Sequence, residues 1–422
     1  MILERALTPG EKSVSRKNYL IYNIINGASY MCLGETVLIL LAVQLQCSDT
    51  VVAFLGCMMY CGFLLLPLGK WMTARTGAAK SQAQFWVYRN IAVLTVACSV
   101  PVSLWFSRDW AELPLLLGAF LFYGFRAAGI VMSQPLVGEI CETHDRGRFI
   151  AISGALFYLT GFTALGVITL LLKWSSNIWT LFWIIVSGAS LGIISSRFLL
   201  NIHETNRIQL SAREPLRGKI APVLRLRVIR RQIVAGMICY LAYILVVPIS
   251  MLTLKRGYEI SDTLALIFAL FQFAGMTAAG YVQSRIADKL GSRNMVLIAY
   301  ACFGLTAVLW IISPSELNFL FTLPAFLTGA YGGIGTTNAL PQYYLDTVPP
   351  KMQIVSSIII SLSTGVIAGL LGMVISSGLL KLSASWNHSD SPFLTYRIYF
   401  ILVAILILLM GIFVRRLENC RA

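Results

Sequence analysis

The chain has 422 residues, of which 57% are hydrophobic and 12% are charged, and its formal net charge is +15. An ordinary soluble domain carries about 25% charged residues, so this chain has too few polar side chains to cover a soluble core, and its composition predicts a protein that lies in a lipid bilayer. The basic residues gather at the ends of apolar segments and form no basic face, which argues against a nucleic-acid partner.

Twelve apolar segments are long enough to cross a bilayer, which requires about 20 helical residues. The first follows a polar, basic stretch and exceeds the roughly 7–15 residues of a signal-peptide core, so we expect an uncleaved first span. The predicted spans are 19–45, 51–72, 85–106, 113–140, 149–172, 177–200, 232–254, 262–284, 294–313, 317–340, 354–380 and 395–414.

Lysine and arginine are concentrated in every second loop between these spans. If the N-terminus is inside, the inner loops contain Arg146, Arg148 and the arginine-rich stretch 213–231, whereas the outer loops contain few cations. Because cytoplasmic loops carry an excess of Lys and Arg, we expect both termini to be cytoplasmic. The protein is expected to be a multi-pass protein of the cell membrane.

A polar stretch divides the twelve spans into two sets of six. We therefore predict an all-α integral membrane fold with 12 transmembrane helices in two six-helix bundles. The first bundle is expected in residues 1–200, a cytoplasmic linker at 201–231 and the second bundle in residues 232–422. Parallel halves of this kind are a known transporter architecture.

The loops after the second and eighth spans support the idea of two repeated halves. When Gly291 is aligned with Gly77, Lys289 falls on Arg75. A glycine that ends a helix lets the chain turn, and cations beside it are expected to face the cytoplasm. The sequence therefore predicts the same turn at the same place in both halves.

The fourth predicted span carries a cation, Arg126, near its middle. A cation at the centre of a bilayer costs about 2.5–3.5 kcal/mol on insertion scales, and a chain retains it where it faces a cavity, a partner or a substrate. Pro135 and Glu139 of this span match Pro341 and Asp346 of the tenth, which has a glycine in place of the arginine. We interpret Arg126 as a substrate anchor; the alternative is an arginine paired with an acid for packing alone.

The arrangement of six plus six spans resembles the major facilitator superfamily over the whole chain. The loop Asp288-Lys289-Leu290-Gly291-Ser292-Arg293 is similar to the cytoplasmic loop motif of that family, and Tyr123-Gly124-Phe125-Arg126 resembles its span-4 motif with a buried arginine. The resemblance implies the major facilitator fold and alternating access. It also implies a gating role for the loop residues Asp288, Lys289, Gly291, Arg293, Gly77 and Arg75.

The sequence departs from the family pattern at two places. The first-half loop has Ala74 where the family has an aspartate, and the fifth span lacks the Gly-Pro pair of the family's antiporters. The missing pair lowers the expectation of drug–proton exchange.

Glu35, in the first span, is the other deeply placed charge. In the family that the chain resembles, spans 1 and 4 line the cavity of the first half. A carboxyl group held between desolvation and a nearby arginine can titrate near physiological pH, as proton coupling requires. We therefore predict that Glu35 and Arg126 form a coupling pair; the alternative is a static bridge that sets the helix register.

Other polar side chains in the spans are candidates for substrate binding, or alternatively for contacts between helices. The predicted substrate-binding residues are Arg126, Asn23, Asn26, Tyr30, Gln134, Tyr240, Tyr243, Gln272, Tyr331, Asn338 and Gln342. On an ideal helix Tyr30 and Glu35 are about 140° apart, so both face one site only if the helix kinks or breaks. Gly27 and Gly34 are suited to that role.

The sequence shows no metal-ligand spacing, no nucleotide-binding loop and no nucleophile motif, so we expect no enzyme, no metal and no cofactor. We predict a monomeric secondary active transporter of a small anionic or zwitterionic solute, working by proton-coupled symport, with sodium as the alternative coupling ion. Two other functions stay open: a proton-coupled exporter of amphipathic, drug-like compounds, and a membrane receptor that binds a solute without moving it.

Overall fold

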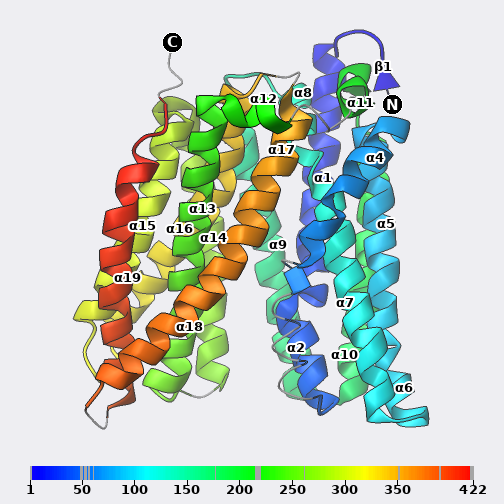
Figure 1. Ribbon diagram of the computed structural model, residues 1–422. Helices are drawn as coiled ribbons and strands as arrows, with labels where there is room; N and C mark the ends of the chain where they lie inside the picture. The colour runs from blue at the N-terminus through cyan, green and yellow to red at the C-terminus, as the bar shows by residue number, and fades with distance from the viewer. Residues whose placement is uncertain are drawn as a thin grey trace. The chain divides into compact units, whose positions relative to one another are not determined.

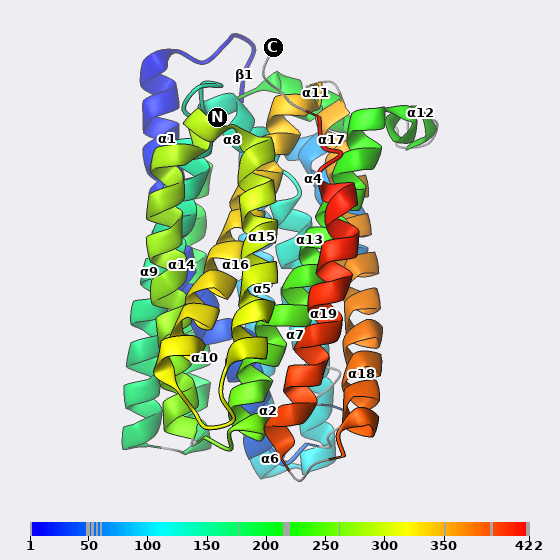
Figure 2. The ribbon, with the colours of Figure 1, turned by 90° about the vertical axis from the view of Figure 1, so that its left-hand side faces the viewer.

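The computed structural model describes residues 2–47, 51, 55, 58–59, 61–175, 177–213, 220–260, 262–349, 352–388 and 391–418. Within these residues the chain is helical apart from short connections and one pair of two-residue strands (Figures 1 and 2). The predicted helical membrane fold is therefore confirmed.

The helices and strands follow one another in this order. The first half of the chain forms β1 (Ile2–Leu3), α1 (Pro9–Leu33), α2 (Glu35–Gln44), a short 3₁₀ turn (Phe63–Leu65), α4 (Leu66–Thr76), α5 (Ala78–Ala97), α6 (Ser99–Trp105), α7 (Arg108–Ile130), α8 (Ser133–Ile140), α9 (Arg146–Trp174), α10 (Ile178–Leu200), β2 (Glu204–Thr205), α11 (Asn206–Arg213) and α12 (Ile220–Arg225). The second half forms α13 (Arg227–Leu252), a π-helical turn (Thr253–Gly257), α14 (Asp262–Leu290), α15 (Ser292–Ile312), α16 (Phe319–Thr347), α17 (Gln353–Leu362), a second π-helical turn (Ser363–Ile367), α18 (Ala368–Trp386) and α19 (Pro392–Val414).

Nine helical segments of the described chain are long and apolar enough to cross a membrane, and they coincide with nine of the predicted spans. Two further predicted spans, 262–284 and 317–340, lie on α14 and α16. The remaining one, 51–72, falls partly outside the described residues. The exact number of spans therefore stays a prediction.

Several predicted spans consist of two helices, and the breaks have local causes. Gly34 adopts an extended backbone (φ −70°, ψ 171°) between α1 and α2, so the helix ends there. This is one of the two glycines suited to break the first span. Between α7 and α8, Pro135 lies in the first turn of the new helix. A proline is tolerated there because the N–H groups of the first turn have no acceptor within the helix.

The chain forms two compact units. The first comprises Met1–Thr143, Leu156–Ile220 and Pro349–Leu362, and the second comprises His144–Ala155, Ala221–Val348 and Ser363–Ala422. The first turns of α9 thus belong to the second unit, and α17 belongs to the first. The predicted division into bundles at the linker stays a prediction.

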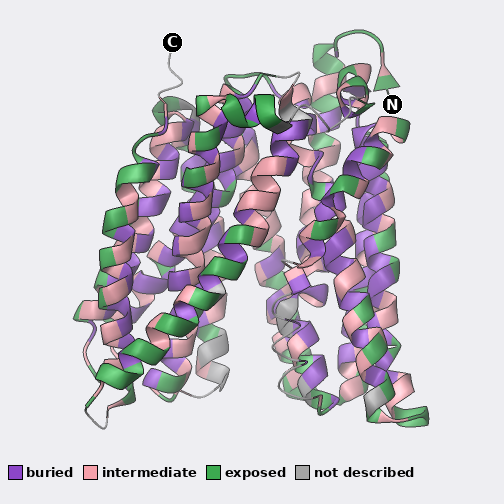
Figure 3. Ribbon diagram, in the orientation of Figure 1, coloured by how far each residue is buried: buried purple, intermediate pink, exposed green. Residues whose placement is uncertain are grey.

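Each unit has its own core of apolar side chains. In the first unit Val93, Phe122 and Ile185 are fully buried. In the second unit the rings of Trp310 and Phe400 stack with centroids 5.7 Å apart and planes 10° apart. The faces of α18 and α19 that point away from this core carry many exposed apolar residues (Figure 3). Because lipid is as apolar as these side chains, close packing rather than exclusion of water holds such helices together.

The first part of the polar segment after α10, residues 201–213, caps one end of the first unit. Strand β2 pairs in parallel with β1 at the chain's N-terminus. The carboxylate of Glu204 accepts hydrogen bonds from the backbone N–H groups of Ala78 (2.8 Å) and Ala79 (3.1 Å), at the N-terminus of α5. The next residue, Thr205, donates from its N–H group (2.9 Å) and its hydroxyl (2.6 Å) to Glu139. The sequence predicts a linker here but does not indicate these contacts.

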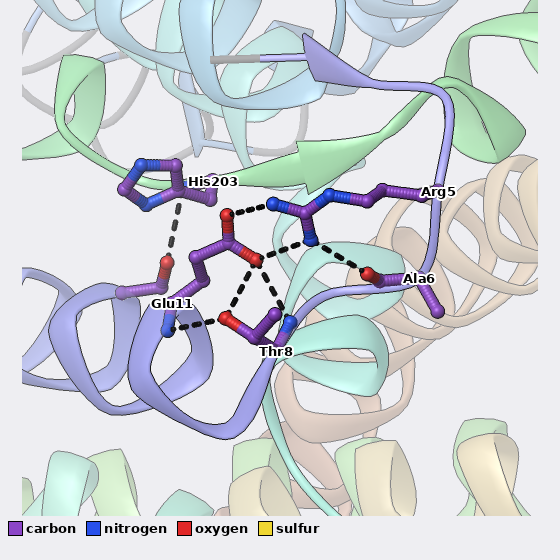
Figure 4. Close-up of polar contacts among 6 residues, drawn as sticks. Arg5, Ala6, Thr8, Glu11 and His203 are labelled. Atoms are coloured by element: carbon purple, nitrogen blue, oxygen red, sulfur yellow. Dashed lines mark hydrogen bonds and ion pairs between the residues drawn. The ribbon is translucent and has the colours of Figure 1, made fainter.

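The N-terminal segment is tied to this cap (Figure 4). Thr8 and Glu11 form a reciprocal capping box at the start of α1, an arrangement that satisfies two free N–H groups of a helix. Arg5 forms an ion pair with Glu11 at 2.7 Å. The N–H group of His203 donates to the hydroxyl of Ser15 at 3.0 Å. These contacts hold β1 beside β2.

Glu204 predicts a pH-dependent stability for this cap. Burial raises the pKa of its carboxyl group from 4.5 to about 7, although the two N–H donors of α5 oppose the shift. Since the folded state favours the protonated form, Glu204 contributes stability that is fully present below about pH 4.5 and is lost as the pH rises through about 7. As the pH rises from about 4.5 to about 7, we expect the melting temperature of wild type in detergent to fall relative to that of Glu204→Gln, because the amide does not titrate. Glu142→Gln, which removes the carboxylate of the surface pair with Lys12, is the control. A difference in melting temperature between wild type and Glu204→Gln that stays constant from about pH 4.5 to about 7 would contradict the pH-dependent stability assigned to Glu204.

Candidate functional site

The most unusual buried side chain of the first unit is Arg89 on α5, which is 0% exposed. The buried positions of α5 include Phe85, Trp86, Arg89, Val93 and Val96, and this spacing places them on one face of the helix. Arg89 therefore points into the unit and not into lipid. Arg89 is not among the site residues predicted from the sequence.

Arg89 is surrounded by one amide and two aromatic rings. Its Nη2 donates to Oδ1 of Asn26 on α1 at 3.1 Å, and Nε1 of Trp86 donates to the same oxygen at 3.0 Å. The guanidinium carbon lies 4.5 Å from the ring centroid of Trp86 and 5.3 Å from that of Phe122 on α7. Nε and Nη1 of Arg89 have no hydrogen-bond partner among the described residues. The buried cation is thus only partly compensated.

Arg126 on α7 carries a second positive charge in the same unit. Its guanidinium carbon lies 4.8 Å from the ring centroid of Tyr30 on α1, and it is close enough to Arg89 for the two charges to interact. No hydrogen bond or ion pair joins Arg126 to another residue in the part of the chain that the structure describes. The side chain of Glu35 lies outside the described residues, so the coupling pair stays a prediction.

This arrangement has the chemistry of an anion site. A buried charge without a counter-charge is costly, and aromatic faces offset only part of the cost, about 2 kcal/mol for a desolvated cation. A carboxylate or phosphate that accepts from the free N–H groups of Arg89 completes its hydrogen bonding, because guanidinium groups bind such oxygens in pairs. Two neighbouring cations increase the preference for a negative ligand.

The predicted first-half residues are only partly brought together. Asn26 contacts Arg89, and Tyr30 contacts Arg126. Asn23 instead donates to the carbonyl of Tyr19 on its own helix at 3.1 Å. Gln134 is half-buried on α8. Arg89 and Trp86 were missed, although the cost of an arginine inside an apolar span, the reason for selecting Arg126, applied to Arg89 as well.

A second polar cluster lies in the second unit. Asn338 on α16 donates from Nδ2 to Oε1 of Gln283 on α14 at 3.0 Å. Gln283 is 0% exposed and its Nε2 has no partner among the described residues. The ring of Tyr243 on α13 packs against Phe303 with centroids 6.2 Å apart. Gln283 was not among the predicted residues. Its position as an amide inside an apolar span could have identified it from the sequence.

The other predicted second-half residues are distributed over the same helices. Gln342 is buried on α16, whereas Tyr240 on α13, Gln272 on α14 and Tyr331 on α16 are half-buried. Their part in substrate binding stays a prediction.

The predicted turns at the two matched glycines are present. Gly77 joins α4 to α5 with φ 87° and ψ 170°, and Gly291 joins α14 to α15 with φ 78° and ψ 155°. They are the two glycines with positive φ in the described chain, a conformation that glycine adopts without steric cost. The same backbone conformation therefore occurs at aligned positions of both halves.

The side chains of the two loops make different contacts. The guanidinium of Arg75 lies over the ring of Trp71 at 3.9 Å. Arg293 donates to the carbonyl of Arg415 at 3.1 Å. Lys289 is exposed, and the side chain of Asp288 lies outside the described residues. A gating role for these loops stays a prediction.

The described chain combines apolar helices of membrane length with buried polar clusters, as expected of a multi-pass membrane protein. The family model of the Major Facilitator Superfamily matches residues 19–373, and the chain belongs to this family. Members of the family are transporters rather than enzymes, and they bind small-molecule substrates within the membrane.

Solved structures share the fold at low sequence identity. The proton:xylose symporter XylE of E. coli, bound to 6-bromo-6-deoxy-D-glucose, is 12% identical with a TM-score of 0.70, over 96% of each chain. A bacterial homologue of the iron transporter ferroportin is 14% identical with a TM-score of 0.71, over 94% of this chain and 98% of the other. The human organic anion transporter MFSD10 is 13% identical with a TM-score of 0.64, over 94% and 99%. No curated protein matches the sequence.

Replacing Arg89 with methionine tests whether the cation is kept for function. Because its charge is buried and incompletely paired, we expect Arg89→Met to leave the free energy of unfolding unchanged or to raise it, while ligand-induced stabilisation is lost. Lys70→Met is the matched control, because Lys70 is also buried but donates to the carbonyl of Ala212 at 2.8 Å, and we expect it to destabilise the protein. A marked loss of stability in Arg89→Met would assign the arginine to packing.

Proposed function

We propose that this protein is a secondary active transporter of a small organic anion or zwitterion, with Arg89 and Arg126 as the groups that bind the negative charge. The observation that carries the proposal is the buried, incompletely paired guanidinium of Arg89 beside the unpaired Arg126 in the described chain. The chain is proposed to lie in the cell membrane with both termini in the cytoplasm. Its two bundles, 1–200 and 232–422, alternate access to the site.

The physical support is charge complementarity in a poorly solvated place. Each guanidinium is stabilised mainly by aromatic faces and an amide oxygen, groups that hold a cation without neutralising it. An entering carboxylate supplies the missing charge, and hydrogen bonds to charged groups contribute about 1.5–3 kcal/mol. One of the solved neighbours is named an organic anion transporter, which agrees with this substrate class.

Proton-coupled symport through Glu35 is the second part of the proposal. Glu35 starts α2 directly after the break at Gly34, which releases it from the helical register of Tyr30. Two solved neighbours are named as proton symporters of xylose and of fucose. Sodium is the alternative coupling ion, and export of amphipathic compounds or solute sensing without transport are the alternative functions.

A thermal-shift panel tests the substrate class. We expect small carboxylates or amino acids to stabilise the purified protein, by about 2.7 kcal/mol at a hundredfold excess over Kd, and Arg126→Gln to weaken the affinity by about tenfold to a hundredfold. Arg285→Gln, at an exposed arginine on α14, should bind as wild type does. Stabilisation by neutral sugars alone would refute the anion site, and stabilisation by lipophilic cations alone would favour the exporter.

Transport by reconstituted vesicles tests the coupling. We expect an inward proton gradient to drive accumulation of the stabilising ligand by wild type. Glu35→Gln should exchange the ligand across the membrane but fail to accumulate it, because its amide cannot carry a proton. Glu112→Gln, on α7, serves as the control. If Glu35→Gln still accumulates ligand in response to the gradient, Glu35 does not couple protons to transport.

A further inference from the structure

A pocket lined by arginines lies where the beginning of α13 meets the end of α19, two helices that are side by side in the second unit (Figure 2). Its volume is about 480 Å³. The lining residues are Arg227, Arg230, Arg231, Val234, Phe413 and Arg416. This pocket contains none of the residues of the proposed transport site.

The positive charge of the pocket is largely unbalanced. Arg231 forms an ion pair with Glu418 at 2.7 Å. The guanidinium groups of Arg227, Arg230 and Arg416 form no hydrogen bond or ion pair with any residue that the structure describes, although that of Arg416 lies over the ring of Phe413. Among the described residues, the four guanidinium groups of the pocket thus have one carboxylate partner, Glu418, which pairs with Arg231. Their mutual repulsion favours a ligand with several negative oxygens, and phosphate fits the fork of an arginine.

The pocket lies at the end of two membrane-length helices. Arg227 is the first residue of the apolar segment Arg227–Gly257, and Arg416 stands two residues beyond the end of Pro392–Val414. Both ends are cytoplasmic in the proposed topology. The arginines therefore occupy the depth at which lipid headgroups are found, where juxtamembrane cations attract anionic lipids by about 1 kcal/mol each.

An apolar stripe leads from the pocket towards the membrane interior. Leu409, Ile412, Phe413 and Arg416 have the spacing of one helical face, and the first three are 60%, 57% and 47% exposed. In Figure 3 this exposed surface continues along α19. Across the pocket Val234 of α13 adds another exposed apolar side chain. A charged end next to an apolar stripe matches an amphiphile better than a free phosphate ion.

We propose that this pocket binds the phosphate headgroup of an anionic membrane lipid, whose acyl chains lie on the exposed apolar face of α19. Arg230 and Arg416 are the principal headgroup ligands, since each comes from a different helix and neither has a carboxylate partner among the described residues. A lipid bound in this way bridges α13 and α19.

Native mass spectrometry of the full-length protein in detergent tests this site, with phosphatidylglycerol and phosphatidylcholine as probes. We expect tighter binding of phosphatidylglycerol to wild type. The double variant Arg230→Gln/Arg416→Gln should bind it about 25-fold more weakly, from about fivefold for each arginine. Arg197→Gln, at an exposed arginine in the last turn of α10, is the matched control and should bind as wild type does.

Each other outcome overturns the proposal. Equal binding of the two lipids means that the pocket does not recognise an anionic headgroup. An unchanged preference in the double variant, or a loss of the same size in Arg197→Gln, means that the preference arises elsewhere. Equal thermal stabilisation by inorganic phosphate and by phosphatidylglycerol means that the pocket takes a soluble anion. The single variants Arg230→Gln and Arg416→Gln, with intermediate binding expected, replace the double variant if it unfolds.

Discussion

An arginine side chain that leaves water must have its charge stabilised by the groups around it, and this constraint organises the first unit. Asn26 directs its oxygen at Arg89, while Trp86 and Phe122 present ring faces to the same cation. Tyr30 presents its ring face to Arg126. These neighbours keep both cations in the unit without cancelling their charge. Helices α1, α5 and α7 thus meet at a site whose charge attracts an anion.

The two halves share a backbone device but support it with different side chains. Gly77 and Gly291 adopt nearly the same conformation before α5 and α15. An acid lies beside each of these helix N-termini. In the first half Glu204 accepts from two N–H groups, and in the second Asp346 accepts from the hydroxyl of Ser292 at 2.8 Å. The two halves thus place different acids beside the same kind of turn.

Arginine serves different purposes at different depths of this molecule. In the core of the first unit its charge is only partly stabilised, which suits a ligand that must enter and leave. At the end of α13 and α19 it is accessible and surrounded by other arginines, which suits a lipid that stays bound. In the loops an excess of cations is the pattern that the positive-inside rule associates with the cytoplasmic side. The net charge of +15 is therefore spread over several distinct environments.

The sequence by itself determined the helical membrane fold, the family and the cost of Arg126, because these depend on local hydropathy, motif spacing and charge. It also identified Gly34 as a place for a helix break. Only the tertiary structure decided that Arg89 is buried beside Arg126, and that Glu204 caps α5. The physical reason is that burial and pairing arise only when helices far apart in the sequence pack together. The hydropathy of a span, in contrast, depends only on the residues of that span.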